Sequence, residues 1–319
     1  MAGAVKHDYH LVNPSPWPLV GSISAMIMML GAVTWGHSGA DGILVGGSTQ
    51  ESAFMQLKGN WIFFFGFALV LLTMAGWWKD VVDESVKSGE NTKPVVRIGL
   101  RYGMVLFIAS EVMFFVAWFW AFFGLALFPG AGDAILLADG TQMLNADGLP
   151  AHLQNDARLH ATGGVYPPVG VEPLSPWQLP LINTLVLLLS GTTVTWAHHA
   201  LQVGDRDGFM QGLLITILLG AFFSFLQGYE YYEVFALGMF GFSGETYGGT
   251  FFMATGFHGF HVLVGTIFLL VCYFRGMAGH FTPDRHFGFE AAAWYWHFVD
   301  VVWLFLFACI YVMGNQGLW

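Results

Sequence analysis

Two carboxylic acids lie deep inside apolar stretches of this chain, and they are the residues most able to do chemistry. The first, Glu111, lies in a stretch rich in phenylalanine, ten residues into a predicted helix that starts at residue 101. An ionised carboxylate there would be costly, so we expect Glu111 to be protonated or firmly hydrogen-bonded. It could act as a proton relay or a substrate contact, or be a neutral acid bonded to a neighbouring helix. The residues alone leave both interpretations open.

The second acid, Asp300, has a histidine three residues before it, His297. Residues three apart share one face of a helix, so this pair can form a hydrogen bond. The indole nitrogens of Trp296 and Trp303 are further donors within reach along the chain. Because several donors can satisfy one carboxylate locally, a structural polar cluster is the favoured interpretation.

The chain has twelve histidines, which invites a heme or metal hypothesis because neutral imidazole is a common ligand for both. The closely spaced candidates are His198, His199, His258 and His261. However, no pair stands in a recognised ligand pattern, and no repeated Glu-x-x-His motif of a di-iron site is present. The two cysteines, Cys272 and Cys309, are too far apart for a paired motif and are interpreted as small core residues. We therefore expect neither a metal site nor a catalytic residue.

Long apolar stretches must position these residues, because only 10% of the chain is charged and 55% is hydrophobic. A membrane-spanning helix needs about 20 apolar residues. Seven such spans are predicted, near 18–37, 58–78, 101–128, 178–200, 208–232, 248–274 and 290–313, and their backbone must be helical in lipid. The sequence thus predicts an all-α polytopic membrane protein without a separate catalytic domain.

Two other classes of seven-span protein are considered. A retinal protein needs a lysine in a helix to form its Schiff base, and the last span has none. A secondary transporter stays open, since Glu111, Asp300, Glu230 and Glu233 could line a path. Paired broken helices, which are typical of transporters, are not evident.

The loops suggest the organisation and orientation of the chain. We predict an inner-face segment 1–17, a two-helix unit 18–78, an inner loop 79–100, and a five-helix unit 101–319 with a long outer loop 129–177. In this arrangement all but two of the eleven cations, Lys58 and Arg158, fall on one side, which predicts the N-terminus inside and the C-terminus outside. The formal net charge of −10 and the lack of a basic stripe argue against nucleic acid. The first span has no basic flank and no cleavage site, so it is not interpreted as a removable signal.

Polar residues near the inner ends of spans could bind lipid phosphate or only anchor the helices in the interface. They include Arg275, Arg285, Trp78 and Glu84. Near the N-terminus, His7 and His10 could exchange protons at near-neutral pH and buffer a neighbouring proton channel, or they could lie in a solvated tail.

Several strings together resemble the third subunit of cytochrome c oxidase, in the heme-copper oxidase family. They are His7-Asp-Tyr-His10, Asn13-Pro-Ser-Pro-Trp-Pro18, Trp77-Trp-Lys-Asp80, Gly99-Leu-Arg-Tyr-Gly103, Ser110-Glu-Val-Met-Phe-Phe115, Thr195-Trp-Ala-His-His199, Gly204-Asp-Arg206, Thr255-Gly-Phe-His-Gly-Phe-His261, His286-Phe-Gly-Phe-Glu290 and Ala293-Trp-Tyr-Trp-His-Phe-Val-Asp-Val-Val-Trp-Leu-Phe305. The resemblance covers every predicted span and is weakest in the outer loop, about 130 to 170, which looks longer than in the family.

The resemblance implies a fold in which the first two spans are splayed from the other five, leaving a V-shaped cleft filled by phospholipid. Arg275 and Arg285 match residues that hold lipid headgroups, with Trp78 and Glu84 as weaker matches. Glu111 matches a carboxylate that carbodiimides modify in this family.

The resemblance also implies a role. Heme and copper are expected in partner subunits I and II, while the third subunit stabilises the complex, supports proton uptake and slows inactivation during turnover. The expected location is a bacterial or mitochondrial inner membrane, with possible contacts to other respiratory complexes. A quinol-oxidising relative is an alternative, although its third subunit typically lacks the first two spans.

Overall fold

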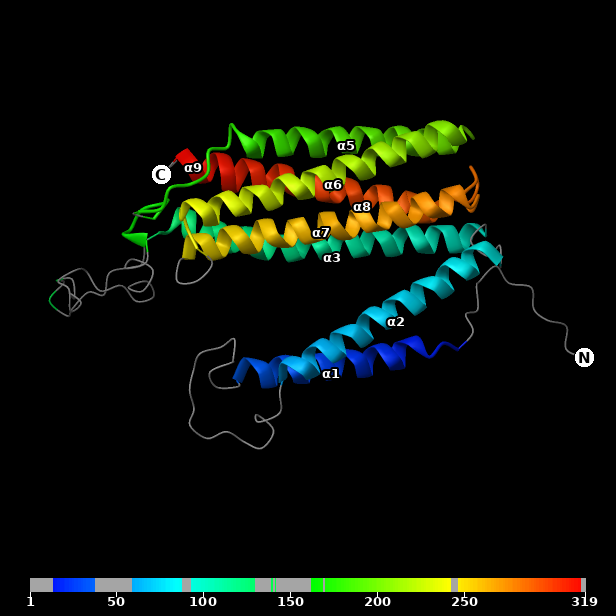
Figure 1. Ribbon diagram of the computed structural model, residues 1–319, viewed down its shortest axis with the longest axis horizontal. Coiled ribbons are helices and arrows are strands. Elements are labelled where there is room, and N and C mark those ends of the chain that lie inside the picture. Colours follow the sequence, from blue (N-terminus) through cyan, green and yellow to red (C-terminus); the bar gives the residue numbers. More distant parts are fainter. Residues whose placement is uncertain are drawn as a thin grey trace, which may run out of the picture. The chain divides into compact units, whose positions relative to one another are not determined.

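The computed structural model describes residues 14–37, 59–87, 93–129, 139, 141, 162–168, 170–241 and 246–316. Within these residues, seven helices are long and apolar enough to cross a membrane, which confirms the predicted all-α polytopic fold. They are α1 (Trp17–His37), α2 (Gly59–Lys87), α3 (Pro94–Leu127), α5 (Leu179–Gln202), α6 (Arg206–Leu237), α7 (Thr246–Met277) and α8 (Phe287–Leu306) (Figure 1). The helix α8 continues into a π-helical segment, η3 (Phe307–Met313), and a short last turn, α9 (Gly314–Gln316).

Several helices extend beyond the predicted spans. The region predicted as the inner loop 79–100 is helical up to Lys87 and again from Pro94. Apolar content marks only the part of a helix that crosses the hydrocarbon, whereas good helix formers continue the same hydrogen bonding in the polar layer. Proline is well suited to the first helical turn, which explains why α3 begins at Pro94.

The ends of α6 follow directly from its sequence. Asp205 precedes the helix, and its side chain accepts a hydrogen bond of 2.9 Å from the backbone N–H of Gly208, which satisfies a free donor of the first turn. At the other end Gly238 adopts a left-handed conformation with φ of 62°, which a glycine tolerates best. The helix is therefore longer at both ends than the predicted span 208–232.

By its internal contacts the chain divides into two compact units, residues 1–98 and 99–319. In the first unit, α1 and α2 form an antiparallel pair. Gly31 and Gly66 lie where the two backbones meet, and a Cβ atom at either position would collide with the backbone of the other helix. Near one end of the pair, the indole N–H of Trp17 donates to Asp80 Oδ2 at 2.6 Å.

In the second unit, α8 is the most buried of the helices and forms the centre of the core. Its indole rings at Trp296 and Trp303 are fully buried. Glycines make room for the first of them, because a Cβ at Gly265 would lie 3.0 Å from the ring and one at Gly220 2.5 Å from it. Close steric fit as well as apolar burial therefore stabilises the packing of α8.

Residues of the predicted outer loop 129–177 pack on one end of the five-helix unit, among them Tyr166 and Leu174. The ring of Tyr166 contacts the rings of Phe122 and Tyr247, each with centroids 5.8 Å apart. Burial raises the pKa of the Tyr166 phenol well above its usual value. The side-chain amide of Asn315 also donates to the backbone oxygen of Leu174 at 2.8 Å.

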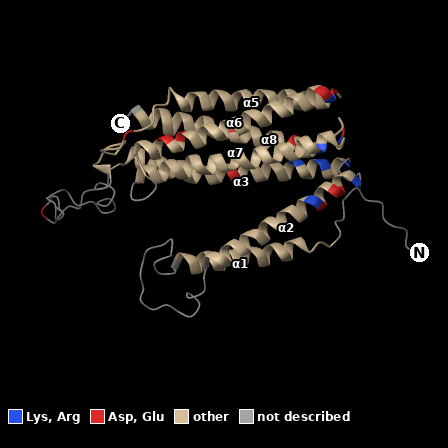
Figure 2. Cartoon of the chain, viewed as in Figure 1, with Lys and Arg blue, Asp and Glu red and all other residues tan. Residues whose placement is uncertain are grey.

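The described basic residues of the five-helix unit lie at its other end, where α3, α6 and α8 begin and α5 and α7 end (Figure 2). They are Arg101, Arg206, Arg275 and Arg285. Such a one-sided distribution is the pattern on which the predicted orientation depends.

Candidate functional site

The predicted intramembrane acid Glu111 lies on α3 and has a partner on α7. Its Oε2 atom is 2.9 Å from Nε2 of His261, within hydrogen-bond distance. The imidazole is almost fully buried, and its ring lies against the rings of Phe114 and Phe115. The expectation that Glu111 is firmly hydrogen-bonded is therefore met by a residue that the sequence reasoning did not pair with it.

The second nitrogen of His261 defines how many protons this pair holds. Its Nδ1 lies 2.6 Å from the backbone oxygen of Phe257, which can only accept, so Nδ1 carries a hydrogen. A neutral imidazole then accepts at Nε2 from a protonated Glu111, whereas a charged imidazole donates to an ionised one. In both cases one shared proton lies between the two side chains, and the pair is neutral overall.

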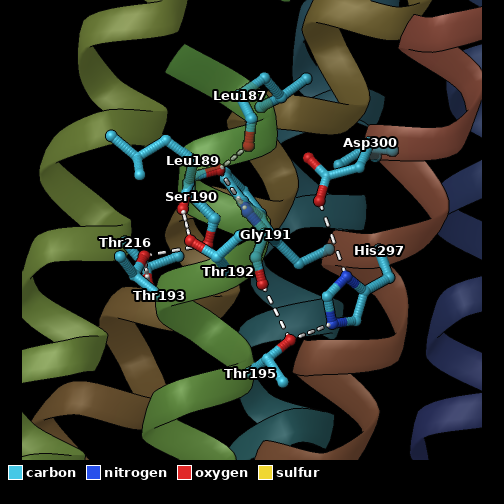
Figure 3. Close-up of polar contacts among 12 residues, drawn as sticks. Leu187, Leu189, Ser190, Gly191, Thr192, Thr193, Thr195, Thr216, His297 and Asp300 are labelled. Carbon is cyan, nitrogen blue, oxygen red and sulfur yellow. Dashed lines mark hydrogen bonds and ion pairs between the residues drawn. The ribbon is translucent and has the colours of Figure 1, made fainter. Parts of the chain in front are cut away.

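The predicted polar cluster of His297 and Asp300 is present and includes a residue of α5 (Figure 3). His297 Nδ1 lies 3.6 Å from Asp300 Oδ2, an ion-pair distance rather than a hydrogen bond. On its other side, His297 Nε2 is 3.1 Å from Thr195 Oγ1, whose hydroxyl donates to the backbone oxygen of Gly191 at 2.9 Å. Because that hydroxyl hydrogen is already used, Nε2 is the donor to Thr195.

The prediction that Trp296 and Trp303 supply donors to Asp300 is wrong. Their indole N–H groups donate instead to Ser190 Oγ and Thr184 Oγ1 on α5, each at 2.9 Å. Both residues lie within one turn of Asp300 on α8, but their long indole side chains reach hydroxyl groups on the neighbouring helix instead. A small residue on α5 admits the carboxylate instead, because a Cβ at Gly191 would overlap Asp300 Oδ2.

Another acid, Glu230 on α6, was considered in the sequence only as part of a transport path, together with Glu233. In the structure Glu230 is fully buried and accepts a hydrogen bond of 2.5 Å from the hydroxyl of Tyr311. The predicted span ended only two residues after it, which made Glu230 look interfacial. The available signal was Gln227, a second polar residue one turn earlier on the same face.

An ion pair that was not predicted links α3 to α8 near the basic end of the unit. Arg101 contacts both carboxylate oxygens of Glu290, at 3.0 Å and 3.1 Å. The carboxylate is largely buried and the arginine is about half exposed. The two residues are 189 positions apart, so no local pattern in the sequence pairs them.

Of the predicted lipid-binding residues, Arg275 is half-buried and Arg285 is exposed. The guanidinium of Arg275 lies over the ring of Phe281 at 4.6 Å, and its Nε has no hydrogen-bond partner among the described residues. By contrast, the neighbouring Arg206 donates to the backbone oxygens of Gly276 and Met277. The guanidinium of Arg275 is therefore less fully hydrogen-bonded within the chain than that of Arg206.

The remaining predicted site residues lie elsewhere. Trp78 and Glu84 are on α2 in the first unit, where the indole is exposed and Glu84 is half-buried. His7 and His10 fall outside the described residues. Both cysteines are buried with free thiols, as predicted. Among the residues that the structure describes, no group of three or more His, Cys, Asp or Glu side chains is arranged to hold a metal ion.

Comparison with known proteins identifies the family. A model of the family described as cytochrome c oxidase subunit III matches residues 7–150 and 152–315. Proteins named cytochrome c oxidase subunit 3 from Tragelaphus oryx, Syncerus caffer and Bos taurus are each 47% identical over 309 residues, which is 97% of this chain and 98% of theirs. The family predicted from the sequence is thereby confirmed. This multi-pass membrane protein belongs to the cytochrome c oxidase subunit III family and is a subunit of a terminal oxidase complex.

Proposed function

We propose that this chain is a non-redox core subunit of a proton-pumping oxidase that transfers electrons from cytochrome c to oxygen. Subunits I and II carry the heme and copper, and this chain stabilises the catalytic one. The observation that carries the proposal is the match to subunit III of cytochrome c oxidase over nearly the whole chain. The pairing of Glu111 with His261, and of Asp300 with His297, supports a structural role for these acids rather than a transport path.

Phospholipid binding is the second part of the proposal. Arg275 supports it, because it is only half-buried and carries a planar guanidinium, a group suited to phosphate. Arg285, exposed in the tight turn formed with Thr282, is the second expected contact to a headgroup. Trp78 and Glu84 on α2 are expected to contribute more weakly.

The third part concerns orientation and proton supply. Because the basic end of the five-helix unit should face the negative inner side, the N-terminus lies inside and the C-terminus outside in a bacterial or mitochondrial inner membrane. His7 and His10 then lie at the inner surface, where imidazoles exchange protons readily near neutral pH. There they help to deliver protons to the catalytic subunit.

Removal of this chain from the purified oxidase tests the proposal. Oxygen consumption should continue at first, then decay several-fold faster per turnover than in the intact complex. The loss in initial rate should be steepest at alkaline pH, where proton delivery limits turnover. Adding the purified chain back to the depleted complex should restore both properties, which controls for damage during removal.

Two outcomes would contradict the proposal. A depleted complex that keeps full activity through many turnovers would rule out the stabilising role. Stoichiometric iron or copper in the isolated chain would rule out the assignment of all redox centres to the partners.

An H7A/H10A variant separates proton supply from assembly. It should assemble normally, and its initial rate should fall only at alkaline pH.

A further inference from the structure

Glu230 lies in a polar cluster that joins α5, α6 and η3 near the end of the five-helix unit where α6 ends. Its Oε1 atom accepts two hydrogen bonds, from the Tyr311 hydroxyl at 2.5 Å and from the Gln227 side-chain amide at 3.1 Å. The Gln227 oxygen in turn lies 3.5 Å from the side-chain nitrogen of Asn183 on α5. All four side chains are buried.

Two acceptor atoms of this cluster have no partner among the described residues. They are Oε2 of Glu230 and Oδ1 of Asn183. A buried acceptor without a hydrogen bond costs roughly 1–3 kcal/mol, and an ionised one costs more. Two such atoms in one cluster indicate that a donor is missing from the set of protein groups.

The surroundings supply no positive charge. No described Lys, Arg or His lies within ion-pair distance of Glu230. Its ionisable neighbours are Tyr231, Glu233 and Tyr311, none of which is a cation. The Tyr231 hydroxyl is already hydrogen-bonded to Thr255 on α7, at 2.7 Å. An ionised Glu230 would therefore be a buried charge without a counter-ion.

We propose that Glu230 is a neutral carboxylic acid and that it binds one buried water molecule together with Asn183. The proton sits on Oε2 and is donated to the water, and the water donates to Oδ1 of Asn183. One added water pairs both orphaned acceptors. The protonated state follows from the surroundings, because no described cation compensates the charge of an ionised Glu230. The Gln227 side chain links Asn183 to Glu230 through its own two hydrogen bonds, so the two residues belong to one cluster.

The site is thus a proton-binding and water-binding site of the third subunit, separate from the pair of Glu111 and His261. Its geometry depends on the π-helical segment, which carries Tyr311, the hydroxyl donor to Glu230 Oε1. π-Helical turns often occur at functional sites in this way.

Infrared spectroscopy of the purified oxidase tests the proposal. The spectrum of the wild type minus that of E230Q, scaled on the amide band, should contain a carbonyl stretch of a protonated carboxylic acid at neutral pH. The band should shift to lower frequency in heavy water, because the acid proton exchanges with the bound water. Carboxylate bands in its place would overturn the proposal and indicate an ionised acid, with or without a bound cation.

The water is tested by the N183L variant, which removes its second partner. The acid band should persist but move to higher frequency, because the Glu230 hydroxyl loses its acceptor. An unchanged band would overturn the shared water site. If E230Q fails to assemble, Y311F provides a second test, since loss of the donor to Oε1 should also raise the carbonyl frequency of a neutral acid; no shift in this variant would overturn the proposed neutral state.

Discussion

His261 on α7 and Glu111 on α3 are joined by a 2.9 Å contact between Nε2 and Oε2, although they are 150 positions apart in the sequence. The backbone oxygen of Phe257 fixes the hydrogen on the other ring nitrogen. The pair therefore satisfies the hydrogen bonding of two polar groups within an apolar environment and holds α3 against α7.

Replacing Glu111 by Gln should leave proton pumping intact. The amide N–H of glutamine can donate to Nε2 of a neutral His261, so the contact between the helices is retained without a titratable group. The measurement is the number of protons pumped per electron in reconstituted vesicles, along with the thermal stability of the complex. Loss of pumping would instead support a role for Glu111 in proton transfer.

The matched variant for this test is Glu111→Leu, which removes the partner of the His261 ring. A buried nitrogen left unpaired costs about 1–3 kcal/mol, so this variant should lower thermal stability where the glutamine variant does not. Equal stability of the two variants would show that the hydrogen bond contributes nothing.

Replacing Gly191 by Ala should destabilise the complex, because the new methyl group would overlap Oδ2 of Asp300. Overpacking of this kind costs about 1–3 kcal/mol. Gly228 on α6 is the control, since a Cβ there meets no atom within 4 Å in the chain. Gly228→Ala should be neutral or slightly stabilising, because alanine favours the helix by roughly 0.5–1 kcal/mol. Similar losses in both variants would contradict this prediction.

The ion pair between Arg101 and Glu290 should show measurable coupling. We expect R101Q and E290Q each to destabilise the complex, and the double variant to be little worse than the more damaging single one. Because the arginine is about half exposed, the coupling free energy should be modest, about 1 kcal/mol. A double-mutant cycle on resistance to detergent denaturation measures it, and purely additive effects would show that the two residues do not interact.

Replacing Arg275 by Gln should reduce the phospholipid that purifies with the oxidase, because a half-buried planar cation suited to phosphate is lost. The content of bound phospholipid, measured by native mass spectrometry, is the readout. Arg206→Gln is the control, since that guanidinium is occupied by the backbone oxygens of Gly276 and Met277. Equal lipid loss in both variants would argue against a specific contact at Arg275.

The apolar pattern predicted all seven spans, because hydrocarbon imposes a minimum length on each of them. It located the helix ends less well. The polar turns up to Lys87 and from Pro94 lie outside the apolar runs, and their helical state follows from propensity and hydrogen bonding. A hydropathy pattern measures neither helix propensity nor hydrogen bonding, so it does not detect these helix ends.

The polar contacts divide in the same way. His297 and Asp300 lie three residues apart on one helix, so their proximity could be predicted from the sequence. The partner of Glu111 could not be predicted from the sequence, because the contact with His261 depends on how α7 is rotated against α3. The misassigned indole of Trp303 has the same cause, since its partner Thr184 is on another helix.

Because η3 is a π-helical segment, the direction of its side chains depends on the number of residues between Phe307 and Met313 as much as on their identity. In a regular α-helix each residue advances the direction of the side chains by roughly 100°. Deleting one residue from this segment would let the backbone relax to the regular form and would swing the aromatic ring of Tyr311 away from α6. Substitutions should therefore be tolerated better in this segment than changes in its length.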